Sequence, residues 1–275
     1  MEKDLSQEII PSFAGWFSGK TALVTGATSG IGREFAKLLA SYGCRVLACG
    51  RNKQDMKSLL SELNKNSGIV SEGFIADLSS RSSRQKLIKK ISQTREVDVL
   101  INNAGFGHIG DFCLASEELI DSMREVNMNA VVDFSREFLP KMIKKGCGGI
   151  LNVGSTASFF GTPGSGLYGA TKHFVLGFTD ALHQEALSYG VHVTGIYPGH
   201  THSRFVSRAT EGKTKKWEKG MSPVSVAKSG LQGLSQNKTR VVPGLYNKAL
   251  FVGAKIMPTS FILEKLYEKF SKNHK

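Results

Sequence analysis

Three side chains in the second half of the chain have the types and spacing needed to donate a proton to a carbonyl oxygen. Tyr168 and Lys172 stand four residues apart, so on a helix they project from one face, and Ser155 lies 13 residues before the tyrosine. An ammonium beneath a phenol favours the ionised phenol. The three residues therefore predict a tuned proton donor, although this Tyr/Lys spacing also occurs in amphipathic helices without a catalytic role.

A glycine-rich segment follows a short apolar stretch near the start of the chain. Residues 20–25 have the pattern of a buried strand, Gly26, Gly30 and Gly32 come next, and a helix with regularly spaced apolar residues follows. In such a unit the glycines permit a tight turn, close approach of a pyrophosphate and close packing of helix on strand. The helix N-terminus then faces the phosphates. The segment predicts a dinucleotide site, with a plain loop as the alternative.

The ends of the next two predicted strands indicate which dinucleotide binds. Such strands end in Asp or Glu when the ribose 2′-hydroxyl is held, whereas an arginine accommodates a 2′-phosphate. The strand at 45–49 ends without an acid and is followed by Arg51, which favours NADP(H) unless Arg51 is only a solvated loop residue. After the strand at 68–76, Asp77 is expected either to bind the adenine amine or to cap the helix after Ser79.

Strands and helices alternate along the rest of the chain. Strands are also predicted at 97–101, 149–153, 191–197 and 238–243, and helices at 53–64, 82–93, 116–145, around Tyr168 to about 189, and 222–234. Strands that alternate with helices of this length build βαβ units with right-handed crossovers. We therefore predict an α/β fold, a doubly wound parallel sheet with helices on both faces.

Composition and charge limit the class of protein. The 275 residues include 40% hydrophobic residues, as in an ordinary globular domain, and carry a net charge of +13. The segment from Glu211 to Lys275 holds 13 basic residues against 4 Glu. Such a surface favours phosphorylated cofactors, coenzyme A esters or anionic lipids, but no nucleic-acid-binding signature accompanies it. Four cysteines without metal or C-x-x-C spacing indicate reduced thiols in a cytoplasmic protein.

Both ends of the chain are predicted to be additions to a catalytic domain at 19–245. The N-terminal arm, 1–18, has acids and Pro11 where a signal peptide needs a basic start, and its apolar residues should pack on the domain or on a second subunit. The basic extension at 246–275 has an apolar helical face formed by Leu263, Leu266, Tyr267 and Phe270. This helix either lies on an anionic bilayer or docks on protein. No apolar run is long enough to span a membrane.

The motifs, in this order, resemble those of the short-chain dehydrogenase/reductase family over about residues 18–245. They are TGATSGIG at 25–32, NNAG at 102–105, V-N-x-N around Asn127, Ser155, YGATK at 168–172 and PG at 198–199. The stretch at 151–199 is similar to the branch containing 17-beta-hydroxysteroid dehydrogenases and very-long-chain 3-oxoacyl-CoA reductases. The resemblance implies a Rossmann fold of about seven strands in the order 3-2-1-4-5-6-7, and a homodimer or homotetramer.

The resemblance also implies a role for each site residue. Tyr168 would be the general acid, giving its proton to a ketone oxygen as hydride arrives from the nicotinamide. Lys172 would lower the pKa of the phenol and hold the nicotinamide ribose, Ser155 would bind the substrate oxygen, and Asn127 would keep a helix bent around a water that links Lys172 to solvent. The implied contacts with NADP(H) come from Gly26, Thr28, Ser29, Gly30, Ile31, Gly32, Arg51, Asn52, Asp77, Leu78, Asn103, Ala104, Gly105, Tyr168, Lys172, Pro198, Gly199 and Ser203.

Two loops rich in apolar residues suggest a hydrophobic substrate, unless some of these residues pack in a subunit interface. They hold Phe106, His108, Ile109 and Phe112 after the fourth strand, and Phe159, Phe160, Pro163 and Leu167 after the fifth. His200 and His202 lack a third ligand, so no metal site is predicted. We predict an NADPH-dependent oxidoreductase that reduces a hydrophobic ketone or 3-oxoacyl compound, or runs in reverse. The alternative is an NADP(H)-binding sensor or membrane-associated scaffold without significant turnover.

Overall fold

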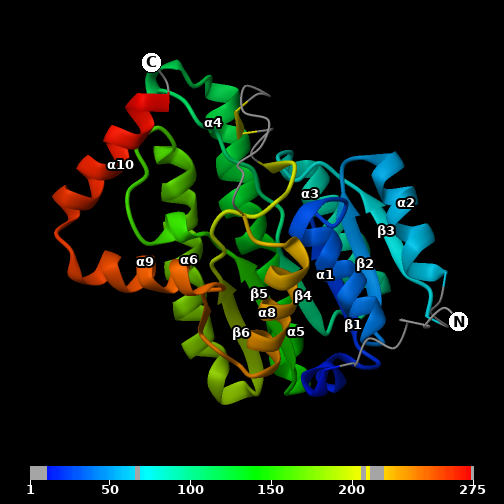
Figure 1. Cartoon of the computed structure of the whole chain (residues 1–275). Coiled ribbons are helices and arrows are strands. Elements are labelled where there is room, and N and C mark those ends of the chain that lie inside the picture. Colours follow the sequence, from blue (N-terminus) through cyan, green and yellow to red (C-terminus); the bar gives the residue numbers. More distant parts are fainter. Residues whose placement is uncertain (1–10, 66–68, 206–208, 211–219, 274–275) are drawn as a thin grey trace, which may run out of the picture.

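One sheet of parallel strands, in the order β3-β2-β1-β4-β5-β6-β7, runs through the middle of the molecule (Figure 1). The computed structural model describes residues 11–65, 69–205, 209–210 and 220–273. The strands are β1 (Thr21–Thr25), β2 (Arg45–Gly50), β3 (Glu72–Ile75), β4 (Val99–Asn102), β5 (Gly148–Val153), β6 (Val191–Ile196) and β7 (Arg240–Val241). The predicted fold class and strand order are confirmed. β3 and β7 are shorter than predicted, and they are the two edge strands.

Side chains that alternate along β1 divide between two hydrophobic cores, one on each face of the sheet. Ala22 and Val24 belong to one core and Leu23 to the other, as the two-residue period of a strand requires. Both faces are apolar because helices cover both. The first core is completed by α1 (Gly30–Ser41), α2 (Lys53–Asn64) and α8 (Pro223–Ser235), the second by α3 (Arg81–Thr94), α5 (Ala130–Lys145) and α6 (Gly166–Ala186).

The long helix predicted at 116–145 is interrupted in its first half. α4 (Glu117–Arg124) continues into a single π-helical turn, η3 (Glu125–Asn129), before α5 begins. In this turn the Asn127 side chain is bonded to the backbone of Phe106, from whose amide it accepts at 3.0 Å and to whose carbonyl it donates at 2.9 Å. The extra residue of a π turn thus places Asn127 against the end of β4.

The described part of the N-terminal arm packs on its own domain, which was one of the two alternatives. The 3-10 helix η1 (Ser12–Phe17) buries Phe17 completely in the first core. The Trp16 ring stacks on His192 of β6 at a centroid distance of 5.1 Å. Phe13 also packs against this core, whereas Ile9 and Ile10 lie outside the described residues. The domain boundaries at 18 and 245 stay predictions.

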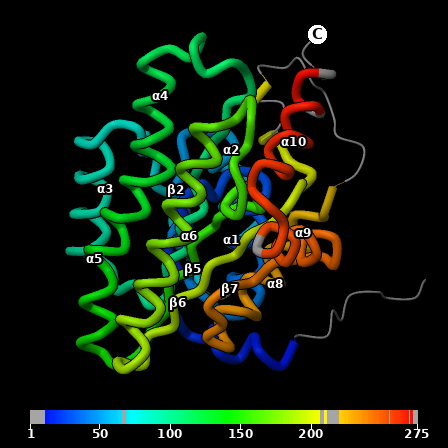
Figure 2. Tube along the Cα trace, turned by 90° about the vertical axis from the view of Figure 1, so that its left-hand side faces the viewer, coloured from blue at the N-terminus to red at the C-terminus, as the bar shows by residue number. Residues whose placement is uncertain are grey.

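The C-terminal extension forms two helices, α9 (Leu245–Ile256) and α10 (Thr259–Asn273), and α10 lies against the loop that leads into α6 (Figure 2). A Cβ built on Gly161 would lie 2.8 Å from Leu263, and one on Gly164 would lie 2.1 Å from Phe270. These two residues of the predicted apolar face therefore dock on their own domain, whereas Tyr267 stays exposed. Among the described helices, none is both long and apolar enough to cross a membrane.

We expect Phe17→Ala to lower the free energy of unfolding by about 3–5 kcal/mol, because it leaves a cavity under a fully buried ring. Urea denaturation followed by circular dichroism measures this loss. The control is Phe112→Ala, which removes a ring that is 63% exposed and should change stability by at most about 0.5 kcal/mol. An equal effect of both substitutions would show that η1 does not belong to the core.

Candidate active site

The carboxyl ends of the strands meet at one edge of the sheet and enclose a cavity of about 410 Å³. The residues predicted to contact a dinucleotide line this cavity, with the exception of Gly32. Ser155, just after β5, lines it together with Tyr168 and Lys172, near the start of α6. Asn127 does not line the cavity, and its side chain is buried, with 1% exposed. The sequence-predicted residues therefore gather in one place.

The turn between β1 and α1 has a backbone conformation that requires glycine at three positions. Gly26 and Gly30 have φ angles of 65° and 56°, in the left-handed region that favours glycine. A Cβ on Gly32 would lie 2.3 Å from both the Gly26 carbonyl oxygen and Asn103 Nδ2. Within the described residues, the N-cap Ser29 makes no side-chain capping hydrogen bond. The N-terminus of α1 is thus suited to be capped by an anion.

Thr25, at the end of β1, joins the glycine turn to the segment after β4. Its hydroxyl accepts hydrogen bonds from the backbone amides of Asn103 and Ala104, each at 3.0 Å, and donates to the Ile101 carbonyl. The Asn103 side chain donates in return to the Thr25 carbonyl at 2.8 Å. These bonds hold two walls of the cavity in register. Thr25 is the first residue of the TGATSGIG motif, and its sequence context gives no sign of this bridging role.

Two arginines lie at the end of the cavity formed by β2 and α2. Arg51 is exposed and lines the cavity, and the next residue, Asn52, caps α2 by accepting from the Asp55 amide at 2.9 Å. Arg204, from the loop after β6, lines the same cavity and lies 2.7 Å from the Asp55 carboxylate. Arg204 was not anticipated from the sequence, because nothing local relates it to a partner 149 positions away.

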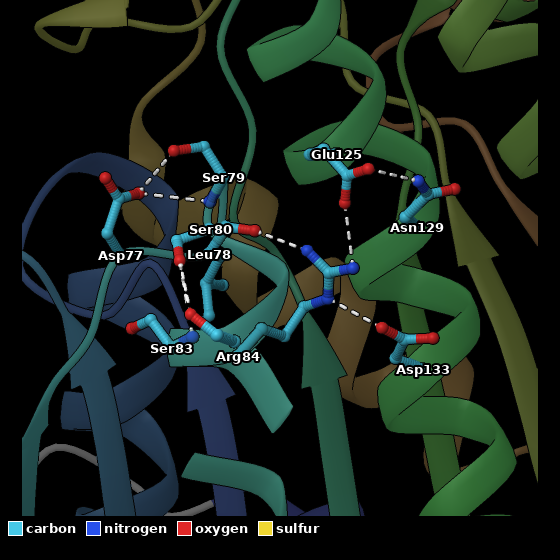
Figure 3. A network of polar contacts seen from close by, with 10 residues as sticks. Asp77, Leu78, Ser79, Ser80, Ser83, Arg84, Glu125, Asn129 and Asp133 are labelled. Carbon is cyan, nitrogen blue, oxygen red and sulfur yellow. Dashed lines mark hydrogen bonds and ion pairs between the residues drawn. The ribbon is translucent and has the colours of Figure 1, made fainter. Parts of the chain in front are cut away.

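Asp77, at the end of β3, shapes a turn and does not cap a helix (Figure 3). Its carboxylate accepts from the Ser79 amide at 3.0 Å and from the Ser79 hydroxyl at 2.9 Å. The N-cap of α3 is Ser80, whose hydroxyl accepts from the Ser83 amide. The capping interpretation is therefore wrong. Asp77 and Leu78 both line the cavity.

A buried arginine beneath this turn was not anticipated from the sequence. Arg84 is 2% exposed, and it donates to the Leu78 carbonyl at 2.7 Å and to Asp133 on α5 at 2.7 Å (Figure 3). Its guanidinium also lies 2.8 Å from Glu125 in the π turn. Planar guanidinium groups suit such multiple contacts. Arg84 thereby ties the Leu78 wall of the cavity to the π turn that carries Asn127.

Tyr168 and Lys172 lie on one face of α6, with the Lys172 ammonium 5.7 Å from the centre of the tyrosine ring. Burial raises the pKa of Tyr168 to about 12, and a hydrogen bond with Ser155 opposes that shift. Burial also lowers the pKa of Lys172 to about 8, and its ammonium donates to the Val153 carbonyl at 2.8 Å. Desolvation thus outweighs the hydrogen bond with Ser155 and keeps the proton on Tyr168 at neutral pH.

Asn127 and Lys172 both lie close to Gly105. A Cβ on Gly105 would lie 3.1 Å from the Asn127 amide oxygen and 3.5 Å from Lys172 Nζ, so these groups border the same small space. Asn127 also donates to the Thr171 hydroxyl at 3.1 Å. Asn127 is therefore a residue that positions the segments around Lys172, and its predicted link through a water to solvent stays a prediction.

The loops near Tyr168 only partly match the expected substrate pocket. Phe106 and Ile109 line the cavity, and the other loop residues named from the sequence do not. Phe159 instead packs on Phe251 of α9 at a centroid distance of 4.6 Å, and Phe112 is 63% exposed. A residue not anticipated, Phe205, covers the Tyr168 ring at 5.4 Å.

Ser203, which lines the cavity, lies beside the glycine turn. A Cβ on Gly30 would be 3.1 Å from the Ser203 Cβ. Its hydroxyl accepts from the Phe205 amide at 3.2 Å. The loop after β6 therefore crosses from Pro198 and Gly199 to the N-terminus of α1, and it forms one side of the cavity.

Lys172→Met should stabilise the protein at pH 7 by about 3 kcal/mol, because a pKa lowered from 10.5 to about 8 means that folding buries the charge at a cost. The penalty is present in full below pH 8 and is relieved as the pH rises toward 10.5, since only the unfolded lysine stays charged in that window. Urea denaturation at pH 7 and pH 9.5 should show the advantage shrinking. Lys238→Met removes an exposed lysine as the control, and a pH-independent advantage of Lys172→Met would contradict the assignment.

Comparisons with known proteins give the family. The model of the short chain dehydrogenase family matches residues 20–214. The 3-oxoacyl-acyl-carrier-protein reductase of Rickettsia prowazekii is 31% identical over 194 residues, which cover 70% of this chain and 78% of the relative. The very-long-chain 3-oxoacyl-CoA reductase of Anas platyrhynchos is 30% identical over 253 residues, 90% of this chain and 79% of the relative.

A solved structure resembles the whole fold. The short-chain dehydrogenase from Sphingobium yanoikuyae in complex with NADPH superposes with a TM-score of 0.80 at 28% sequence identity, over 86% of this chain and 92% of that one. The resemblance stated from the motifs is thereby confirmed. The chain belongs to the short-chain dehydrogenase family.

Proposed function

We propose that the protein reduces the carbonyl group of a hydrophobic ketone or 3-oxoacyl compound with NADPH, or catalyses the reverse oxidation. The observation that carries this proposal is the placement of Ser155, Tyr168 and Lys172 in the same cavity as the glycine turn and Arg51. A proton donor and a dinucleotide site are thus joined in one space. Family membership and the reductases among the relatives support the same reaction.

The cavity walls fit a dinucleotide. The turn at Gly26 and Gly30 and the N-terminus of α1 would hold the diphosphate, and the exposed guanidinium of Arg51 would meet a 2′-phosphate. The relative from Sphingobium yanoikuyae was solved with NADPH, which supports the choice of NADP(H). When bound, the nicotinamide supplies a hydride to the carbonyl carbon.

The residues of the chain provide the rest of the reaction. Ser155 and Tyr168 would hold the substrate oxygen, and the Tyr168 phenol would transfer its proton to that oxygen as negative charge develops. Lys172, fixed by the Val153 carbonyl, would stabilise the resulting phenolate and hydrogen-bond a ribose hydroxyl. In this scheme the high pKa of the phenol in the protein serves the reduction, because Tyr168 begins protonated.

The substrate class follows from the walls near Tyr168. Phe106, Ile109, Phe205 and Ala209 line the cavity with apolar groups, and the relatives from Rickettsia prowazekii and Anas platyrhynchos are named for 3-oxoacyl substrates. A 3-oxoacyl thioester or a ketone with an apolar body fits this lining. The alternative of a sensor or scaffold without turnover has no support in the relatives. A cytoplasmic homodimer or homotetramer remains our proposal from the family resemblance.

Tyr168→Phe should reduce kcat by at least about 100-fold and leave NADPH affinity within a factor of about three, since only the proton donor is lost. NADPH oxidation is followed with a panel of apolar ketones and 3-oxoacyl thioesters, and affinity is measured by fluorescence titration. Phe106→Leu, which conserves an apolar wall, is the control for disturbance of the cavity. Undiminished turnover by Tyr168→Phe would rule out its role as general acid.

Arg51→Asp should weaken NADPH binding by at least about tenfold and leave NADH binding unchanged or improved, because it replaces a phosphate partner with a repulsive charge. The dissociation constants of both cofactors are compared by isothermal titration calorimetry for the wild type and the variant. The control is Arg95→Asp, at an arginine that pairs with Glu72 at the start of β3 and does not line the cavity. A wild-type protein that binds NADH as tightly as NADPH would contradict the cofactor assignment.

A further inference from the structure

One side of α9 anchors the helix to the domain. The Asn247 side chain is 7% exposed and donates to the Pro243 carbonyl at 2.7 Å. One turn later, the Phe251 ring packs on Phe159, which follows the end of β5. The contacts of Asn247 and Phe251 therefore fix which side of α9 faces the domain.

The opposite side of α9 presents apolar residues to solvent, and we call it the outer stripe, consisting of Leu245, Ala249, Val252 and Ile256. These positions recur at intervals of four, three and four residues, so they lie on one face of the helix. Leu245, Val252 and Ile256 are 84%, 52% and 77% exposed, and Ala249 is also exposed. Figure 1 shows α9 and α10 at the opposite edge of the molecule from α2 and β3. Apolar residues gathered on one exposed face indicate a contact surface.

The charges on α9 have a single sign. The helix carries Lys248 and Lys255 and no acidic residue. Lys248 is exposed beside the outer stripe, and Tyr246 and Met257 extend the apolar surface at its two ends with exposures of 75% and 42%. An exposed apolar face with a lysine beside it, on a helix without acids, is the pattern of a helix that lies in the plane of a bilayer surface.

The positive charge also distinguishes two possible partners of the outer stripe, a second copy of the chain and an anionic lipid surface. In a symmetric contact between two copies, the outer stripe would meet itself and bring like-charged lysines together in a chain whose net charge is already +13. An anionic lipid surface would neutralise the same lysines while covering the apolar groups. The lipid surface is therefore the complementary partner.

We propose that the outer stripe of α9 docks the protein reversibly on anionic phospholipid, with the helix parallel to the surface and its apolar side chains among the lipids. This surface is separate from the side of α10 that packs on Gly161 and Gly164. The proposed membrane-facing surface is thus on α9 and not on the α10 face that was considered from the sequence. The docking does not depend on which carbonyl compound the enzyme reduces.

The test is flotation of the full chain with vesicles of phosphatidylcholine that either contain or lack phosphatidylglycerol. The wild type should bind the anionic vesicles, and binding should weaken as salt is raised. Val252→Glu/Ile256→Glu should reduce the vesicle-bound fraction by at least about tenfold, because two apolar contacts become repulsive charges. NADPH affinity, measured alongside, should stay unchanged and shows that the variant is folded.

The matched control is Leu187→Glu/Tyr189→Glu, which places two acids on exposed apolar positions of η5 (Leu187–Tyr189), outside α9. This variant should bind anionic vesicles like the wild type. Equal binding to vesicles with and without phosphatidylglycerol would overturn the proposal, as would an equal loss in both double variants. The proposal would also be overturned if the α9 variant still bound vesicles but differed from the wild type in oligomeric state on size exclusion, while the control variant did not. The outer stripe would then join copies of the chain.

Discussion

The buried ammonium of Lys172 is the constraint around which the site is built. A charge removed from water is costly unless it is paired, and the described residues pair it only with the dipoles of the protein, chiefly the Val153 carbonyl. That requires β5 and α6 to be held together. The space left near the ammonium is bordered by Gly105 and Asn127, so the end of β4 and the π turn must also meet there.

Buried hydrogen bonds meet this requirement across the sheet. The Asn102 amide on β4 donates to Asn152 on β5 at 2.9 Å, and Asn152 donates to Thr179 on α6, also at 2.9 Å. The three residues connect two central strands to the helix that carries Tyr168 and Lys172. Polar groups in such a place are costly when unpaired, so these two hydrogen bonds favour one relative position of strand and helix.

The fold and much of the site could be predicted because their signals are local. Strand, glycine turn and helix follow one another directly at Gly26–Gly32, and the parallel sheet then brings each strand end to the same edge. The partners of Arg84 and Arg204 could not be predicted, and the choice between protein and bilayer for α10 could not be made, since each depends on residues far away in the sequence. A sequence shows the lysine near Tyr168 but not the loss of solvent, which raises the pKa of the phenol.

The contact between Gly164 and Phe270 links the loop beside the active site to the last helix. Gly164 has a φ of 75°, and a side chain there would occupy the volume of the Phe270 ring. In evolutionary terms, a side chain at position 164 and a large aromatic at position 270 exclude each other. A lineage that shortens or rewrites its C-terminus therefore removes a packing partner of this loop, whose next residue, Ser165, lines the cavity.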